Sequence, residues 1–252
     1  PRQANPVAAA LGGNTLALDE FRFGGTYRRD FTAAQVEATG YYTPRGIGYF
    51  VFETRRLNQH FVNRGVTGRL VVPAVFGTPA RVTAGVDYQN TPITTGNYSR
   101  ADSTVAGQVA ANEESATTVG PFAMVDVALG RRASATAGLR YDRIMFSAEN
   151  LIRPQDGRSE IVYEQFSPRL GLTFRLAEDL ALYASYNEGF EAPILDQLRS
   201  APSRDGEFTA NQSVKPLDVR AFEVGLRGQI GRHVTFEASA YRQRANNLIV
   251  SQ

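Results

Sequence analysis

The stretch of residues 166–176, FSPRLGLTFRL, decides the fold class, because its apolar and polar residues alternate without a break. Its even positions are apolar or proline, and its odd positions are serine, glycine, threonine or arginine. Successive side chains of a β-strand point to opposite faces, whereas the apolar residues of a helix recur every three or four positions. Residues 166–176 therefore predict a strand with one apolar face and one polar face.

The same alternation recurs along the chain, at residues 81–88, 135–142, 222–227 and 233–241. A tetrad of glycine, an aliphatic residue, any residue and an aromatic residue repeats within the alternating stretches, at 85–88, 138–141 and 171–174. Glycine on the polar face of a strand leaves room for a bulky neighbour or eases curvature. The recurrence indicates repeated strands of one kind.

Turns and loops set the next level of organisation. Short polar or glycine-containing breaks follow one another at intervals of about 50 residues, near Asp30, Thr78, Arg131, Glu178 and Gly231. Longer polar breaks lie between them, at 89–115, 150–160 and 190–216. Short turns that alternate with long loops are typical of membrane barrels. We expect an all-β fold, an antiparallel transmembrane β-barrel meander of about ten strands, with short turns at one end and long loops at the other.

Composition excludes several classes of protein. The 252 residues contain no cysteine and two histidines, which excludes disulfide scaffolds, cysteine metal sites and thiol nucleophiles. The 27 basic and 25 acidic residues give a net charge of +2, so nothing indicates a nucleic-acid partner. No run approaches the ~20 apolar residues of a membrane-spanning helix. The chain begins at Pro1 rather than Met and stops after an apolar run, so we expect residues 1–252 to be a partial barrel domain.

Three features favour a barrel in lipid over a soluble β-fold. The predicted strands at 61–76 and 134–148 are longer than the ~5–6 residues usual in soluble sheets. Their polar faces carry opposite charges near mid-strand, which suits a water-filled or plugged lumen. We interpret two charge pairs, Arg140 with Asp142 and Glu223 with Arg227, as ion pairs of the lumen wall rather than as catalytic groups. Aromatic residues near strand ends indicate an interfacial girdle, namely Tyr141, Phe146, Tyr183, Tyr186 and Tyr241.

From Leu180 onward, several ordered motifs carry a resemblance to a known family. They are LYASYNEGFEAP at 182–193, Lys215-Pro216, FEVGLR at 222–227, ASAYR at 238–242 and NLIV at 247–250. This part of the chain resembles the barrel of the TonB-dependent outer-membrane receptors of the siderophore type. Leu217 departs from the acidic residue of the family pattern. The segment GVDY at 85–88 is similar to a strand motif of the same family.

The resemblance implies a receptor in the outer membrane of a Gram-negative bacterium, with an N-terminal plug inside a large barrel. The plug and the C-terminal strands would lie outside residues 1–252. Such receptors import a ferric siderophore or a similar scarce chelate, and the TonB complex supplies the energy through the plug. The implied partners are the TonB complex, the ferric siderophore, and outer-membrane lipid and lipopolysaccharide. No cofactor is expected, since the siderophore is cargo.

Residues of the predicted long loops are candidates for binding an anionic ferric chelate. Guanidinium groups suit carboxylate and catecholate oxygens, and aromatic faces suit planar chelates. The ligand-binding candidates are Tyr98, Arg100, Arg153, Arg158, Arg199 and Arg204. The alternative for each arginine is a solvated loop charge or a contact with lipopolysaccharide phosphates. No residue is predicted to be catalytic or to bind a metal.

Other functions stay open on the sequence alone. A passive porin-like channel would share the alternation and the loop asymmetry. A soluble or surface β-domain for adhesion would also alternate. An enzyme is the weakest alternative, because the sequence places no nucleophile beside a base.

Overall fold

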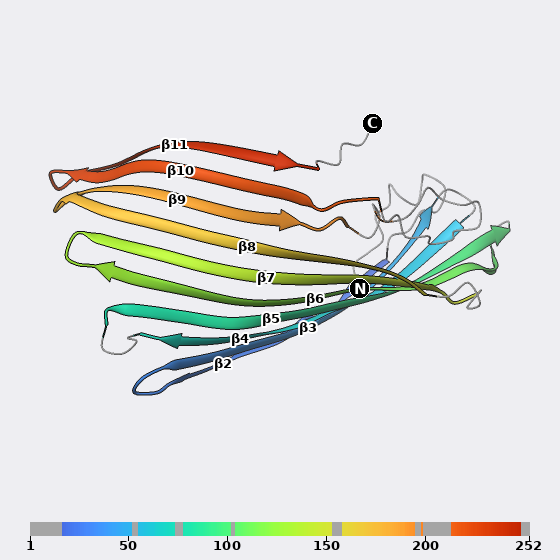
Figure 1. Ribbon diagram of the computed structural model, residues 1–252. Helices are drawn as coiled ribbons and strands as arrows, with labels where there is room; N and C mark the ends of the chain where they lie inside the picture. The colour runs from blue at the N-terminus through green and yellow to red at the C-terminus, as the bar shows by residue number, and fades with distance from the viewer. Residues whose placement is uncertain are drawn as a thin grey trace.

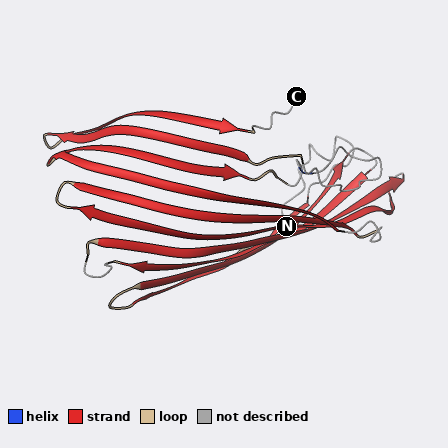
Figure 2. Ribbon diagram, in the orientation of Figure 1, coloured by secondary structure: helices blue, strands red, loops and turns tan. Residues whose placement is uncertain are grey.

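Strands make up nearly all of the described chain, as the computed structural model shows (Figure 1, Figure 2). The structure describes residues 17–51, 55–73, 78–101, 104–152, 158–194, 198 and 213–247. The strands are β1 (Ala17–Glu20), β2 (Phe23–Asp30), β3 (Gln35–Val51), β4 (Arg55–Val72), β5 (Ala80–Ala101), β6 (Thr104–Leu129), β7 (Ala133–Asn150), β8 (Arg158–Ala177), β9 (Leu180–Glu191), β10 (Leu217–Ile230) and β11 (Val234–Asn246).

The strands form one antiparallel meander, in the order β1-β3-β4-β5-β6-β7-β8-β9-β10-β11, with β2 also paired to β3. β1 and β2 pair with β3 one after the other in the same antiparallel register, since Ala17 lies opposite Gly48 and Phe23 lies opposite Tyr42. Together they act as one interrupted strand. The eleven strands therefore make ten crossings, which confirms the predicted all-β meander. Within the described residues the sheet is open, since β11 pairs only with β10.

Proline interrupts the pairing of neighbouring strands. The break between β1 and β2 lies opposite Pro44, where the Phe21 amide donates to the Pro44 carbonyl at 3.1 Å. Pro44 has no N–H to donate in return, so the ladder loses a hydrogen bond there. In the same way, β8 pairs with β9 only from Arg169, opposite Asn187, and the residue before it is Pro168. In the described residues before Pro168, β8 stays paired with β7 but not with β9.

The short turns gather at one end of the sheet (Figure 1). They lie between β2 and β3, β4 and β5, β6 and β7, β8 and β9, and β10 and β11, which confirms the predicted positions. Gly130 and Gly231 adopt positive φ angles of 74° and 63° in two of these turns, a conformation that glycine enters at no steric cost. We call the strand segments next to these turns the turn-side half, and the segments at the other end the loop-side half.

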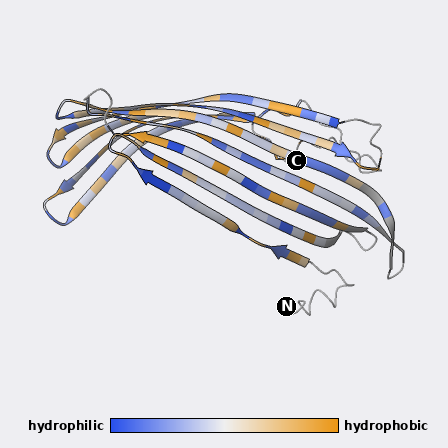
Figure 3. Cartoon of the chain, turned by 90° about the horizontal axis from the view of Figure 1, so that it is seen from below, coloured by the Kyte–Doolittle hydropathy of each residue, from blue (hydrophilic) through white to orange (hydrophobic). Residues whose placement is uncertain are grey.

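The two faces of the sheet differ in the turn-side half. We call the face that bears Leu139, Leu170 and Leu172 the outer face, and the face that bears Arg140 and Arg169 the inner face. Leu170 and Leu172 are 52% and 51% exposed, so no second layer of the described chain covers them. Hydrophobic and hydrophilic residues follow one another along the strands (Figure 3). The predicted apolar strand face is confirmed, and it is not the interior of a two-layered fold.

The polarity of the two faces reverses towards the loop side. On the outer face of β7, the apolar run ends at Tyr141, and Arg143 follows. On the inner face of β7, the polar run ends at Asp142, and Ile144 and Phe146 follow. A strand keeps its alternation through such a point, but each face changes its character.

β8 reverses at the level that pairs with this part of β7. Its outer face changes from Phe166 to Glu164, and its inner face changes from Gln165 to Tyr163. The rings of Tyr141 and Phe166 touch on the outer face, with centroids 4.9 Å apart. The reversal is therefore a property of the sheet and not of one strand.

The predicted long loop at 89–115 is wrong. β5 continues to Ala101 and β6 begins at Thr104, and the two strands pair along this whole stretch apart from two register shifts. The polar residues of 89–115 obscured the strand because the outer face is no longer apolar there. The breaks predicted at 150–160 and 190–216 correspond to the connections between β7 and β8 and between β9 and β10, but the first ends earlier than predicted, because β8 begins at Arg158.

The predicted aromatic girdle is only partly correct. Tyr141 and Tyr186 do lie on the outer face, but Phe146, Tyr183 and Tyr241 lie on the inner face. The outer row near the reversal also includes aromatic residues that the prediction lacked, namely Tyr42, Tyr88, Phe166 and Phe222. Closeness to a strand end does not show which face a residue lies on. Whether its position is odd or even within the strand does, because successive side chains point to opposite faces.

Candidate functional site

Ion pairs cover the inner face of the turn-side half. Arg140 of β7 pairs with Asp142 of its own strand at 2.7 Å and with Asp87 of β5. To reach Asp87 the guanidinium crosses β6, and it does so over Gly120, where an added Cβ would collide with it. The prediction that Arg140 and Asp142 form an ion pair of the wall is confirmed, and the pair extends over three strands.

A second ion-pair group lies on β2, β3 and β4. Glu37 accepts from Arg28 at 2.6 Å and from Arg69 at 2.8 Å. All three side chains lie on the inner face, because Arg28 and Arg69 are the register partners of Glu37. Charges that are paired in this way suit a face that meets water rather than lipid.

The predicted pairing of Glu223 with Arg227 is wrong. Four residues of a strand span about 13 Å, which is too far for an ion pair. Both side chains instead turn to Tyr183 of β9. The Tyr183 hydroxyl lies 3.0 Å from Glu223 and 2.8 Å from Glu237, and the Arg227 guanidinium lies 5.8 Å from the centroid of its ring.

Glycine makes room for the ring of Tyr183. The ring lies over Gly225 of β10, where an added Cβ would collide with it. In the same way Tyr41 lies over Gly65, and Phe122 lies over Gly85. The prediction that glycine on the polar face admits a bulky neighbour is confirmed at Gly85 and Gly225. Gly171 has no such neighbour, because an added Cβ there would meet Thr136 at an ordinary 3.6 Å.

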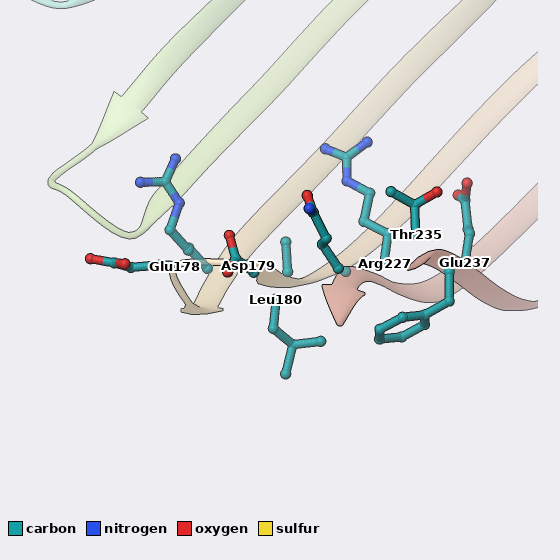
Figure 4. Close-up of a pocket in the computed structure, with 11 residues that line it drawn as sticks. Glu178, Asp179, Leu180, Arg227, Thr235 and Glu237 are labelled. Carbon is teal, nitrogen blue, oxygen red and sulfur yellow. The ribbon is translucent and has the colours of Figure 1, made fainter. Parts of the chain in front are cut away.

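An open cavity of about 550 Å³ lies at the turn-side end (Figure 4). Residues of both charges line it, from the end of β8, the turn between β8 and β9, β10 and β11. The charged residues of this lining are Arg175, Glu178, Asp179, Arg227 and Glu237. With both charges present and one side open, the cavity resembles a protein-contact surface more than an enclosed ligand pocket.

A buried apolar cluster lies on the inner face of the loop-side half. Phe146 of β7, Ile161 of β8 and Leu198 are its buried members. The Tyr163 ring packs edge-on against Phe146, with centroids 6.1 Å apart, and its hydroxyl donates to the Val214 carbonyl at 2.7 Å. Tyr163 lies beyond the apolar run of the outer face, and burial raises its pKa, so the phenol stays protonated and remains a donor. Described residues of the β9–β10 connection therefore pack over β7 and β8.

Sequence reasoning missed this apolar cluster, although a signal was present. In β7 the apolar run at odd positions ends at Tyr141, and beyond it Ile144 and Phe146 occupy even positions, while Met145 alone stays at an odd position. A change of parity inside one strand marks a change of environment across the sheet.

Three of the six predicted ligand-binding residues lie in the described part of the chain. Tyr98 and Arg100 lie in β5 and Arg158 begins β8, so these three belong to strands rather than to loops. The Arg158 guanidinium donates to the Ser147 hydroxyl at 2.7 Å, and the Tyr98 ring lies against Gly96. The remaining candidates, Arg153, Arg199 and Arg204, lie outside the described residues.

Within the described residues, no group of three or more His, Cys, Asp or Glu side chains could hold a metal ion. In the same part of the chain, no helix has the length and apolar character needed to cross a membrane.

The sequence model of the family "TonB dependent receptor-like, beta-barrel" matches residues 7–252. The chain therefore belongs to this family of outer-membrane β-barrel receptors of Gram-negative bacteria. The outer face of the turn-side half is accordingly the face that meets lipid, and the inner face lines the barrel.

Solved structures of receptors share the fold. The chain is 17% identical to the ferric citrate transporter FecA in its unliganded form, with a TM-score of 0.68 over 97% of this chain and 38% of FecA. It is 16% identical to the alcaligin receptor FauA from Bordetella pertussis, with a TM-score of 0.65 over 93% of this chain and 38% of FauA. It is 17% identical to the copper transporter OprC, with a TM-score of 0.69 over 91% of this chain and 39% of OprC. The chain thus spans about two-fifths of the length of these three proteins.

Proposed function

We propose that this chain is part of the wall of an active importer that carries a ferric siderophore or a similar scarce chelate and is energised through TonB. The observation that carries the proposal is the family match over residues 7–252. The similar structures include a ferric citrate transporter, an alcaligin receptor and a copper transporter, and two of these three are named for a metal-containing cargo.

The inner face supports a lumen that is filled by protein or water. Its charged side chains are arranged as cross-strand ion pairs around Arg140 and Glu37. The ten crossings form an open sheet within the described residues, and in this proposal that sheet is one part of a closed barrel wide enough for a plug. In this proposal the plug, which would contact TonB, lies against the inner face.

Cargo would first meet the loop-side half. The strands there continue beyond the apolar run of the outer face, and they carry three of the predicted contact residues, Tyr98, Arg100 and Arg158. We propose that these three, together with Arg153, Arg199 and Arg204, contribute to binding an anionic chelate.

A passive porin-like channel is the second candidate, because a polar inner face would also suit a water-filled pore. The two functions differ in their need for energy. An importer stops when the proton-motive force collapses, whereas diffusion through a channel continues.

The test is uptake of radioactive iron from a panel of citrate, hydroxamate and catecholate chelates, in cells that carry or lack the gene for this protein. We expect uptake of one chelate class to require the gene, and to stop when a protonophore is added or TonB is deleted. Gene-dependent uptake that continues with the protonophore would favour the channel. If uptake of no chelate in the panel required the gene, the proposal that the cargo is a ferric siderophore would be contradicted.

A further inference from the structure

The described sheet splits between β8 and β9 at the level where the apolar run of the outer face ends. The two strands pair from Arg169, opposite Asn187, and only towards the turn side. On the loop side, β8 stays paired with β7 as far as Arg158, and β9 stays paired with β10 as far as Glu191. β8 therefore continues well beyond the end of β9 (Figure 1), and among the described residues no backbone ladder joins the two strands there.

Pro168 explains where the split begins. Its nitrogen carries no hydrogen, so it cannot donate to β9 at the first position beyond Arg169. Phe166, two residues further on the same face, ends the apolar run of β8. Unpaired backbone groups are costly in hydrocarbon, whereas water satisfies them. The split thus occupies the part of β8 that lies outside the membrane.

Side chains, rather than a backbone ladder, hold the loop-side part of β8 to the β9–β10 connection. The Tyr163 hydroxyl donates to the Val214 carbonyl at 2.7 Å, and Phe146 and Ile161 pack against Leu198. Apolar contacts have no fixed direction, so they tolerate small shifts that would break a ladder of backbone hydrogen bonds. This attachment permits movement between the two parts.

A second break lies on the other side of the β7–β8 strand pair. The ladder between β6 and β7 omits Gly120 and Pro121. By the register on either side, these residues lie opposite Asp142 and Tyr141, where the polarity of β7 reverses. The ladder resumes on the loop side of this break. The β7–β8 pair is therefore weakened on both sides at one level, locally towards β6 and along its whole described loop-side length towards β9.

We propose that the split is a joint in the wall, at which the loop-side part of β7–β8 moves against β9–β10 while the turn-side half stays fixed in the membrane. The joint alternates between an open state and a less populated closed state, in which β8 extends its ladder along β9. In the closed state Phe166 lies opposite Phe190, because the register of Arg169 with Asn187 continues. Pro168 favours the open state, since it removes one hydrogen bond of the closed ladder. The joint requires neither TonB nor a particular cargo.

The first test traps the closed state with a disulfide in the full-length protein, reconstituted in lipid vesicles. Residues 1–252 contain no cysteine, so an introduced pair has no competitor in this part of the wall. The test pair is Phe166→Cys/Phe190→Cys. The matched control is Leu170→Cys/Tyr186→Cys, because these two positions are register partners on the same face. We expect a mild oxidant to cross-link the test pair completely, but about tenfold more slowly than the control, because only a minor population is closed at any moment.

The second test restores the missing donor. Pro168→Val supplies an N–H and a residue that favours strands. In this background the test pair should be oxidised within about threefold of the rate of the control pair. In Pro168→Val without cysteines, amide exchange of residues 158–167 should slow by about fivefold, because the closed ladder gains a backbone hydrogen bond. Pro79→Val makes the same replacement in the turn between β4 and β5 and should change neither measurement.

Three results would overturn the proposal. No cross-link of the test pair would show that the split is rigid, and equal rates for both pairs would show that the strands are not split. Unchanged oxidation and exchange in Pro168→Val would show that Pro168 does not set the joint. The melting temperature of each variant is measured before oxidation, and the exchange measurement stands even if a cysteine pair does not fold. No readout involves iron uptake, so failure here is distinct from failure of the proposed transport.

Discussion

The turn-side and loop-side halves of β7 and β8 belong to the same strands and share one register, yet they are built in opposite ways. In the turn-side half, Leu170 and Leu172 lie on the outer face, and Arg140 lies on the inner face. In the loop-side half, Arg143 and Glu164 lie outside, and the cluster around Phe146 lies inside. The medium outside the sheet explains the difference, since hydrocarbon requires an apolar outer face and water does not.

The reversal defines where the strands leave the bilayer. On β8 the apolar outer face runs over residues 166–176, a length that fits the ~9–11 residues of a tilted strand across a membrane. On the loop side of this run β8 continues from Arg158 as an ordinary water-exposed strand, whose inner face packs against protein. One sheet thus contains a membrane segment and a soluble segment in series.

The largest loss of stability should come from a substitution in the apolar cluster on the inner face of the loop-side half. Phe146→Ala removes a ring that is 7% exposed, and the cavity should lower the free energy of unfolding by about 3–5 kcal/mol. Urea-induced unfolding of the full-length protein in detergent measures the loss. Phe146→Leu keeps most of the volume and serves as control. A loss below about 1 kcal/mol would show that the cluster is not packed as described.

A charged residue introduced on the outer face should lower the free energy of unfolding more in the turn-side half than in the loop-side half. Leu172→Arg places the charge near the middle of the apolar run and should cost about 2–4 kcal/mol. Val162→Arg makes the same kind of change on the same face of β8, beyond the run, and should cost less than about 0.5 kcal/mol. Both values come from unfolding of the full-length protein in lipid vesicles. Equal costs would place the membrane boundary elsewhere.

A series of glycine substitutions tests the inner face of the turn-side half. Gly85→Ala should cost about 2–3 kcal/mol, because the new Cβ would collide with the Gly68 carbonyl and the Phe122 ring. Gly120→Ala should cost about 1 kcal/mol, because the Arg140 guanidinium that it displaces is the end of a flexible chain. Gly171→Ala should be neutral or slightly stabilising. Thermal unfolding ranks the three variants, and a reversed order would refute the arrangement of side chains over glycine.

The smallest effect should come from the hydrogen bond of Tyr163. Tyr163→Phe removes the donor to the Val214 carbonyl but keeps the ring against Phe146, so the expected loss is about 1 kcal/mol. Hydrogen exchange of the amides near Val214 should increase, while exchange in the turn-side half stays unchanged. Faster exchange throughout the sheet would show that Tyr163 supports the whole wall.

The alternation of apolar and polar residues was sufficient to predict the meander, the five short turns and the lipid-facing positions such as Leu170. These features depend on the order of residues along one strand, and the amino-acid sequence gives that order directly. The motifs after Leu180 were enough to identify the receptor family. The ion pair of Arg140 with Asp142 could also be predicted, because residues two positions apart in one strand lie on the same face.

Only the tertiary structure decided which side chains meet across strands. Arg140 reaches Asp87 over Gly120, and Tyr183 contacts both Glu223 and Arg227, because the register brings residues of different strands together. The same register places Arg220 opposite Arg244, which no spacing along the chain reveals. Register depends on pairing between strands, and a linear pattern describes each strand only by itself.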